Sequence, residues 1–297
     1  MPRSPRLSHP VLFYADEDEF IAGTVPFLRR GIENDEVVFV AARPDYLESV
    51  RVELGSDASA AIWKNTHVWH SHHASRLRAF YELVSGAPRG ARLRLVGEPV
   101  WPERPEEVRE WQRYESALNA VLAPFPVSLL CLYDAASLDP EIVETAGRTH
   151  PGDRYEEPDS FLRAHRADPS SPPRTAEVVE QVRDPAPARG LALDRAIRAG
   201  VDPDAAVGLS IAVNEILTNA LLHGGGDARL SLWREGASFV CQVEDEGPGI
   251  ADPLAGYRPP AHRTGGRGLW LARQLVDLME ILPVEVGAAV RLCVPVG

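Results

Sequence analysis

Residues 212–224 read AVNEILTNALLHG, and this stretch decides the fold class of the C-terminal third of the 297-residue chain. It belongs to a longer apolar segment that predicts one helix from about Pro203 to His223. Asp202 is placed to cap the N-terminus of this helix, and the glycines at 224–226 are placed to end it. The sequence therefore predicts a long helix that carries a few polar residues on an otherwise apolar surface.

Three polar residues of this helix, Glu215, Asn219 and His223, each lie four positions after the one before. Residues at this spacing lie on one face of a helix. A carboxylate and an amide in line can orient a hydrated Mg²⁺ ion, which keeps several waters and takes few protein ligands. The same spacing is also typical of a solvated helix face, so these three residues alone leave both interpretations open.

Two segments of alternating polarity follow the helix, at 228–235 and 238–246, and predict strands joined by a turn at Gly236. The second segment runs into DEGPG at 245–249. Its aspartate, Asp245, can accept a hydrogen bond from an exocyclic amine, and its glycines let a flat base approach the backbone. On its own, a sequence of this type is also a common turn.

A second glycine-rich stretch, TGGRGL at 264–269, opens a helix that we expect over 268–280. Exposed amides at the N-terminus of a helix can receive phosphate groups. Two further strands are expected at 281–286 and 289–296. Together these elements predict an α/β sandwich, in which helices pack on one face of a mixed or antiparallel sheet.

The three motifs, in this order and on these elements, resemble the N, G1 and G2 boxes of the GHKL ATPase superfamily. Within it, the compact lid and the form of residues 212–224 are most similar to the anti-sigma serine kinases of the RsbW type. The resemblance covers about residues 190–297. It implies that Asp245 reads adenine, that Asn219 holds Mg²⁺, and that Glu215 acts as general base on the acceptor serine. The implied ATP-binding residues are Asn219, His223, Asp245, Gly247, Gly249, Gly266, Arg267 and Gly268.

One departure from the family concerns the adenine pocket. The family often carries a threonine after the glycine that precedes its last strand, where the hydroxyl assists the adenine-reading aspartate. Here the corresponding stretch is Gly287-Ala288-Ala289, so that hydroxyl is missing. Because Glu215 and Asn219 are present, we expect a weakened or water-completed pocket in a working enzyme.

The N-terminal half has a different pattern. From Pro10 to about His150, short apolar runs alternate with amphipathic segments. This alternation predicts a doubly wound, mostly parallel sheet with helices on both faces, RecA-like but without a P-loop. Lys64 is the only lysine of the chain and has no glycine-rich loop beside it. That excludes the phosphate-binding lysine of a P-loop or of a eukaryotic-type protein kinase.

Four segments of this half resemble the MEDS sensory domain, which is associated with DcmR-like and RsbA-type regulators. They are HPVLFYADEDEF, VGEPVWPE, YESALNAVL and CLYDAASLDP, and the resemblance covers about residues 8–150. A MEDS domain followed by an RsbW-like domain is the arrangement of RsbA-type anti-sigma regulators. The order of the domains therefore supports both resemblances.

Three residues are candidates for a sensory pocket. Glu98 and Trp101 follow a predicted strand, and Tyr14 ends the first one. Open α/β sheets place their ligands at the carboxyl ends of the strands. An equally simple interpretation is that Trp101 only packs a loop, and the sequence does not identify a ligand.

These patterns predict a MEDS-like sensory domain at 1–150, a proline-rich linker at 151–190 and an ATP-binding domain at 191–297. Residues 176–182 form a possible edge strand of the second domain. Buried, reduced thiols are expected at the three cysteines, Cys131, Cys241 and Cys293, whose spacing fits neither disulfides nor zinc.

A histidine-rich segment lies outside both resemblances. His67, His70, His72 and His73 could bind Zn²⁺ or Ni²⁺, but nearby acids are scarce. A solvated loop is the simpler interpretation of this segment.

Composition narrows the class of partner and the location. A net charge of −12 argues against a broad grip on nucleic acid. No continuous apolar run approaches the ~20 residues of a membrane span, and the N-terminus lacks a secretory pattern. We therefore expect a cytoplasmic protein that binds other proteins or a small ligand.

The expected function is a bacterial anti-sigma regulator that binds a sigma factor and phosphorylates a serine or threonine of an antagonist protein. A homodimer and a small ligand at the N-terminal domain are further expectations. Two alternatives stay open. One is an ATP-dependent binding module without catalysis. The other is a sensor histidine kinase, although His165 is the only histidine of the linker after residue 151 and lies outside any heptad pattern.

Overall fold

The computed structural model describes residues 7–69, 73–258 and 267–297. The chain divides into two compact units, Met1–Phe161 and Leu162–Gly297. Each unit has its own sheet and its own buried core.

The N-terminal unit is built on a six-stranded sheet. Its strands are β1 (Leu7–Ser8), β2 (Val11–Tyr14), β3 (Val37–Ala42), β4 (Ala61–Asn65), β5 (Leu93–Gly97) and β6 (Val127–Asp134). The order is β1-β6-β5-β3-β4, and β2 also pairs with β6, so β1 and β2 share one edge. Every pairing in this sheet is parallel, as the sequence predicts.

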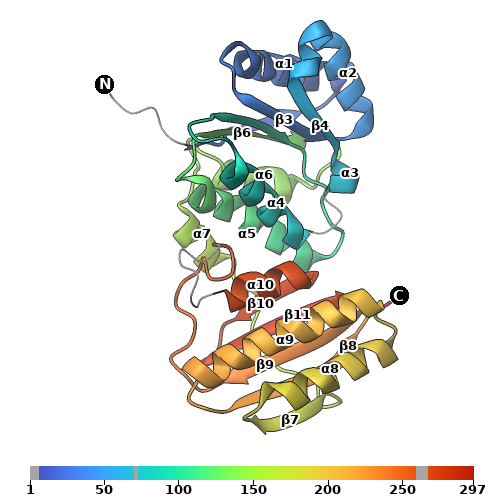
Figure 1. The fold of residues 1–297 in the computed structure, drawn as a ribbon, viewed down its shortest axis with the longest axis vertical. Coiled ribbons are helices and arrows are strands. Elements are labelled where there is room, and N and C mark those ends of the chain that lie inside the picture. Colours follow the sequence, from blue (N-terminus) through green and yellow to red (C-terminus); the bar gives the residue numbers. More distant parts are fainter. Residues whose placement is uncertain (1–6, 70–72, 259–266) are drawn as a thin grey trace. The chain divides into compact units, whose positions relative to one another are not determined.

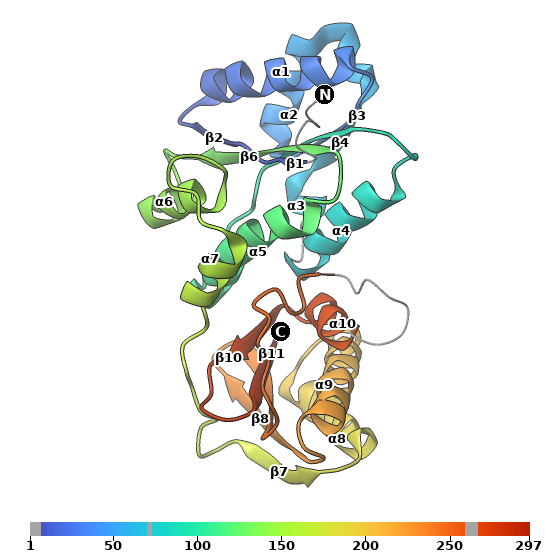
Figure 2. The same ribbon diagram turned by 90° about the vertical axis from the view of Figure 1, so that its left-hand side faces the viewer.

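Helices cover both faces of this sheet. They are α1 (Glu17–Glu33), α2 (Pro44–Leu54), α3 (Thr66–Trp69), α4 (His73–Gly86), α5 (Pro105–Leu122) and α6 (Pro140–Thr149), with a 3-10 turn at Gly55–Ala60. α1 and α2 lie on one face, and α4 and α5 on the other (Figure 1 and Figure 2). Burial from both sides explains why β5 is buried along its whole length.

The first helix shows how local sequence fixes an element. Asp16 caps α1, and its side chain accepts a hydrogen bond of 2.9 Å from the amide of Glu19. The buried face of α1 carries Phe20, Val25 and Leu28, which pack into the core of the unit. Cap and apolar face together define where the helix begins and which side meets the sheet.

The direction of the strands brings four chain positions to one edge of the sheet. β2, β3, β5 and β6 end at Tyr14, Ala42, Gly97 and Asp134. Because all strands run in parallel, residues at or just after these ends lie side by side.

The C-terminal unit is built on a five-stranded antiparallel sheet. Its strands are β7 (Glu177–Val182), β8 (Ala228–Glu235), β9 (Ser238–Asp245), β10 (Leu278–Leu282) and β11 (Ala288–Pro295). Its helices are α8 (Pro185–Ala199), α9 (Pro203–His223) and α10 (Gly268–Leu275). A short helix, α7 (Pro158–Ala164), includes the point in the chain at which the two units divide. The strand order is β10-β11-β9-β8-β7, and α8, α9 and α10 lie on one face of the sheet (Figure 2).

The long helix predicted over residues 203–223 is confirmed with its cap. The side chain of Asp202 accepts hydrogen bonds of 3.0 and 3.1 Å from the amides of Asp204 and Ala205. With a mean hydropathy of 1.5, α9 is long and apolar enough to cross a membrane by length and composition alone. It packs against α8, α10, β9 and β11, however, and its buried residues belong to the core. We therefore assign it as the core helix of the C-terminal unit.

The end of the chain differs from the sequence prediction. The helix expected over 268–280 stops at Leu275, and the strand expected at 281–286 lies earlier, at Leu278–Leu282. In the sheet, β10 pairs with β11, and Leu278, Met279 and Leu282 are buried. Tertiary pairing overrides the helical pattern here, because an apolar run of this length fits a strand as well as a helix.

Residues 151–190 contain regular elements as well as extended chain. They include α7, β7 and the first turn of α8. β7 pairs with β8 at the edge of the sheet, which confirms the edge strand expected at 176–182. α8 packs on α9, and Asp184 caps it by accepting from the amide of Ala186 at 3.0 Å.

Candidate functional site

A cavity of about 320 Å³ lies between α9, the end of β9 and the start of α10. That volume falls within the range of small-molecule sites, about 300–1,000 Å³. Its lining residues are Ile216, Asn219, Ala220, His223, Val243, Asp245, Pro248, Gly249, Ile250, Ala251, Asp252, Leu269, Ala288 and Val290. Most are apolar and a few are polar, which suits a flat heteroaromatic ring that carries hydrogen-bonding edges.

Four of the eight residues predicted to bind ATP line this cavity: Asn219, His223, Asp245 and Gly249. Asn219 and His223 come from one face of α9, together with Ile216 and Ala220. The structure thus brings the helix motif and the DEGPG turn to the same cavity, across the strand β8 that separates them in the sequence.

Two further predicted glycines border the site through their backbones. A Cβ on Gly268 would lie 2.7 Å from Nδ2 of Asn219, and one on Gly247 would lie 2.5 Å from Cα of Gly224. The same Cβ on Gly247 would also lie 2.7 Å from the carbonyl oxygen of His223. The missing side chains therefore let α9, the turn after β9 and the start of α10 touch directly.

Asp245 lines the cavity from the end of a strand. It is the last residue of β9, and its Oδ1 accepts a hydrogen bond of 2.9 Å from the amide of Gly247. This carboxylate accepts no other hydrogen bond among the residues that the structure describes. Ala288 pairs with Asp245 across β9 and β11 and lines the cavity. Ala288 therefore contributes a methyl group, and no hydroxyl, to the cavity wall beside Asp245.

The remaining predicted residues lie at the margin. Glu215 is half-buried on α9, one turn before Asn219, and is not among the lining residues. Arg267 is exposed directly before α10, and Gly266 lies outside the described residues. The roles assigned to these three stay predictions.

A second polar group lies at the carboxyl edge of the N-terminal sheet and is centred on Glu98, whose side chain is buried. The hydroxyl of Tyr14 donates to Oε1 of Glu98 at 2.7 Å. Arg43 donates its amide to Oε2 at 2.7 Å and its Nε to Oε1 at 2.6 Å. Both oxygens of the carboxylate are thus paired within the unit.

This group extends beyond the residues that sequence reasoning names. Nη2 of Arg43 lies 3.2 Å from Oδ2 of Asp134, and the hydroxyl of Thr66 donates to the carbonyl oxygen of Glu98 at 2.6 Å. Arg43, Thr66 and Asp134 each end or directly follow a strand. The rule that ligands lie at the carboxyl ends of the strands, which selects Glu98, could therefore have selected these three residues too.

The network shifts the pKa values of its members. Burial raises the pKa of the Tyr14 hydroxyl above its usual value, and the negative charge of Glu98 raises it further. Burial alone would lower the pKa of Arg43, but the charge and hydrogen bond of Glu98 outweigh this and raise it. Tyr14 is therefore a neutral donor and Arg43 a fixed cation at pH 7.

Trp101 belongs to a neighbouring aromatic group. Its ring centroid lies 5.9 Å from that of Trp111 and 5.7 Å from that of Tyr133. Its Nε1 is buried and makes no hydrogen bond among the residues that the structure describes. The structure thus joins Tyr14 to Glu98 directly, whereas Trp101 packs with aromatic rings beside them.

The histidine-rich segment gives no metal centre among the described residues. His67 is exposed on α3, while His70, His72 and the side chain of His73 lie outside the described part. All three cysteines are buried, as expected. Two histidines that the sequence analysis does not single out, His9 and His150, are buried. Burial lowers the pKa of His9 to about 4 and that of His150 well below its usual value, so both rings are neutral at pH 7.

Comparison with known families matches both units. The MEDS family model, described as the methanogen/methylotroph, DcmR sensory domain, matches residues 8–151. The histidine kinase-like ATPase domain model matches residues 178–294. No curated protein matches the chain in sequence.

Proposed function

Because this chain joins a MEDS sensory domain to a histidine kinase-like ATPase domain, we propose that it is a bacterial anti-sigma regulator of the cytoplasm. Its ATP-binding domain binds a sigma factor and phosphorylates a serine or threonine of an antagonist protein. The N-terminal domain, with a small-molecule ligand at its carboxyl edge, controls that activity, and the protein works as a homodimer.

The observation that carries the nucleotide part of this proposal is the cavity of about 320 Å³ with Asn219 and Asp245 in its wall. Its apolar residues would contact the faces of adenine. The carboxylate of Asp245 would accept a hydrogen bond from the exocyclic amine, using the oxygen that the amide of Gly247 does not occupy. A hydrogen bond to an ionised acceptor is about twice as strong as one between neutral groups.

The residues present also fit a magnesium ion. Asn219 offers an amide oxygen at the edge of the cavity, and Mg²⁺ takes one or two such protein ligands beside waters and phosphates. When bound there with ATP, the ion would neutralise phosphate charge. The amides at the start of α10, next to Asn219, would receive the phosphates.

Glu215 would take the proton of the acceptor hydroxyl. It lies one turn before Asn219, at the margin of the cavity, where an incoming protein side chain can reach it. Phosphoryl transfer needs mostly positioning and neutralisation of charge. A general base adds a factor of about 10²–10⁴.

The first experiment measures ATP binding. We expect calorimetric titration of ATP with Mg²⁺ into the full chain to give saturable binding, and Asp245→Asn to abolish it. Glu246→Gln, which removes the neighbouring exposed carboxylate, is the matched control and should leave affinity unchanged. If the wild-type chain shows no binding at millimolar ATP, the nucleotide part of the proposal is wrong.

The second experiment measures phosphoryl transfer from ATP to purified antagonist proteins. Glu215→Ala should keep ATP affinity but lower the transfer rate by about 10²–10⁴. Glu235→Ala, at the exposed end of β8, is the control and should transfer at the wild-type rate. An undiminished rate in Glu215→Ala would remove the base role.

A second candidate function is an ATP-dependent binding module without catalysis. The methyl of Ala288 opposite Asp245 favours it, because the pocket lacks a hydroxyl that supports adenine binding in the family. ATP-dependent sigma-factor binding without any transfer would support this candidate. A histidine kinase fits less well, because His165 follows α7, a helix of only seven residues, which is short for a dimerising hairpin.

A further inference from the structure

A third polar group is buried inside the MEDS domain. It consists of His9, Glu115, Cys131 and His150, and each offers one ligand atom within 4.8 Å of the others. His9 lies between β1 and β2, Glu115 lies on α5, Cys131 on β6, and His150 directly after α6. All four side chains are buried. His9 contacts Cys131 although 122 positions separate the two residues in the sequence.

The hydrogen bonds of Asn119 determine which ring nitrogen of His9 carries the proton. Nδ2 of Asn119 donates to the carbonyl oxygens of Ser116 and Thr149, at 3.2 and 2.7 Å. Its Oδ1 must therefore face His9, whose Nδ1 lies 3.0 Å away and donates to it. This leaves the lone pair on Nε2 of His9, which points at the sulfur of Cys131 at 3.2 Å.

The same logic applies to His150. Its Nδ1 lies 2.9 Å from the carbonyl oxygen of Ala146, which can only accept, so this nitrogen carries the proton. The lone pair is then on Nε2, 3.7 Å from Oε2 of Glu115. Nε2 of His150 is buried and has no hydrogen-bond partner among the described residues. A buried polar atom without a partner is uncommon and points to a missing ligand.

The arrangement is that of a metal site with its supporting shell. Histidines that bind metals almost always donate their other ring N–H to a carbonyl, carboxylate or water, and both rings do so here. Bonds of about 2.0–2.3 Å around a tetrahedral ion place its ligand atoms roughly 3.3–3.8 Å apart. Three of the separations, 3.2, 3.6 and 3.7 Å, already lie at or near that range.

We propose that His9, Cys131, His150 and Glu115 bind a zinc ion inside the MEDS domain. A thiolate and a carboxylate supply two negative charges, which balance a divalent cation between two neutral imidazoles. One sulfur and two nitrogens favour zinc over the hard cations that prefer oxygen. All four donors come from protein and all are buried, so the site is closed and structural.

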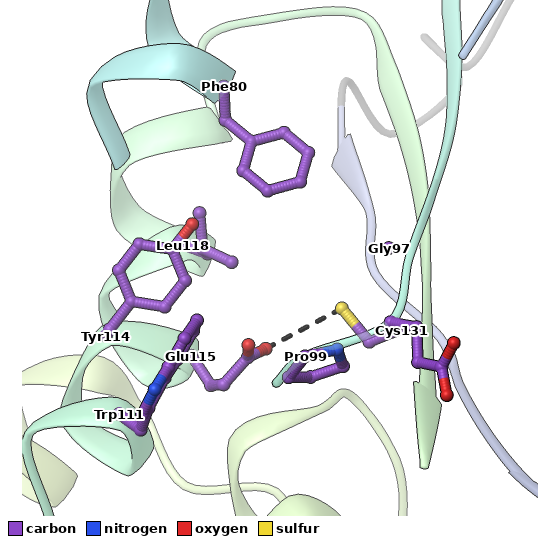
Figure 3. Close-up of a pocket in the computed structure, with 9 residues that line it drawn as sticks. Phe80, Gly97, Pro99, Trp111, Tyr114, Glu115, Leu118 and Cys131 are labelled. Atoms are coloured by element: carbon purple, nitrogen blue, oxygen red, sulfur yellow. Dashed lines mark hydrogen bonds between the residues drawn. The ribbon is translucent and has the colours of Figure 1, made fainter. Parts of the chain in front are cut away.

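Two of the four donors, Glu115 and Cys131, also border a small cavity, whose lining does not include His9 or His150. Figure 3 shows a cavity whose lining includes Glu115 and Cys131, with Oε2 of Glu115 at 3.6 Å from the sulfur. Its volume is about 10 Å³, close to the smallest space that holds one water-sized guest. Glu115 and Cys131 therefore border space in which their side chains can shift when the four donors adjust around an ion.

Such an ion would add a direct link among four elements that strand pairing and the hydrogen bonds of Asn119 already hold together. It would join the β1–β2 connection to α5, β6 and the end of α6. Metal binding at a closed site contributes directly to folding free energy. The role is separate from the ATP site, so failure of this proposal would leave the anti-sigma proposal untouched.

The test uses cobalt as a spectroscopic substitute in the full chain. Reduced protein, stripped with a chelator, is titrated with Co²⁺. We expect about one equivalent to give the visible bands of tetrahedral cobalt and a near-ultraviolet thiolate-to-cobalt band, both removed by Zn²⁺. Histidines 67–73 cannot produce the thiolate band, because that segment contains no cysteine.

Matched variants identify the sulfur. Cys131→Ser should lose the thiolate band, while Cys293→Ser, which alters another buried strand cysteine, should keep it. His150→Gln should weaken Co²⁺ binding at least tenfold, and Glu115→Gln should weaken it less.

If Cys131→Ser fails to fold, a double variant still shows whether Cys131 gives the thiolate band. In Cys241→Ala/Cys293→Ala, Cys131 is the only cysteine left, so a thiolate band there must come from it. Absence of that band in both the wild type and the double variant overturns the proposal. So does a band that disappears in the double variant but persists in Cys131→Ser.

Discussion

The two sites at the ends of strands are built in opposite ways. At the carboxyl edge of the N-terminal sheet, Tyr14 and Arg43 already satisfy both oxygens of Glu98. In the C-terminal unit, Asn219 and Asp245 face an open cavity of about 320 Å³. The first arrangement stabilises its own unit, and a ligand there must replace existing bonds. The second leaves polar groups available and gains its partners from a ligand.

The largest effect is expected at the hydrogen-bonded network around Glu98. Glu98→Ala should lower the free energy of unfolding of the N-terminal unit by about 3 kcal/mol, because it leaves Arg43 and Tyr14 without their buried partner. Hydrogen exchange of peptides from residues 7–157 would measure this. Glu103→Ala, an exposed carboxylate nearby, should change little. An equal effect of both variants would contradict the contrast between the sites.

At the cavity of the C-terminal unit, we expect a substitution to weaken ATP binding more than it lowers the stability of the unit. In Gly247→Ala the new methyl would meet the backbone of Gly224 and His223, which pushes α9 and the turn apart. We expect ATP affinity to fall at least tenfold, which is ~1.4 kcal/mol. Gly190→Ala, on an exposed part of α8 with open space around it, should keep affinity and stabilise the helix by up to about 1 kcal/mol. Calorimetry on both variants distinguishes the site from a general effect of glycine replacement.

The cap of α9 gives an intermediate effect. Asp202→Ala removes two hydrogen bonds to free helix amides and should cost about 1 kcal/mol in the stability of the C-terminal unit. Thermal unfolding followed with and without ATP would test it. The change should not alter unfolding of the N-terminal unit. Loss of stability in both units would show that they unfold as one.

The smallest effect sharpens the comparison at the open site. Ala288→Thr restores a hydroxyl opposite Asp245, and one added hydrogen bond is worth about 0.5–1.5 kcal/mol. Because the new side chain also displaces water, we expect ATP affinity to rise only about two- to fivefold. Ala251→Thr, an exposed position in the same lining, is the control. Weaker binding in Ala288→Thr would show that the pocket is built around the smaller residue.

Local chemistry explains how much of the C-terminal unit could be predicted. The cap at Asp202, the glycines after His223 and the apolar periodicity between them define α9 without reference to the rest of the chain. That the helix, the DEGPG turn and the glycine-rich helix start meet at one site was implied by their resemblance to the boxes of the GHKL superfamily. The end of α10 could not be predicted, because Leu278–Leu282 fits a helix or a strand until β11 pairs with it.

In the N-terminal unit, too, the sequence predicts the type of sheet but not all of the contacts between side chains. Alternating strands and helices predict a parallel sheet, and the rule of carboxyl ends selects Tyr14 and Glu98. It does not reveal that Arg43 holds both oxygens of Glu98, since 55 positions separate them. Trp101 was selected by the same rule, but the structure places it among aromatic rings.

The sequence by itself determined the two domains, the class of each sheet, the long helix and the motifs that line the cavity of the C-terminal unit. These depend on periodicity, capping and short motifs, which act over a few residues. Only the tertiary structure decided which distant polar groups meet. His9 and Cys131 are separated by 122 positions, and no local pattern marks them as partners. Their meeting depends on the order of strands in the sheet, because that order sets which residues share an enclosed space.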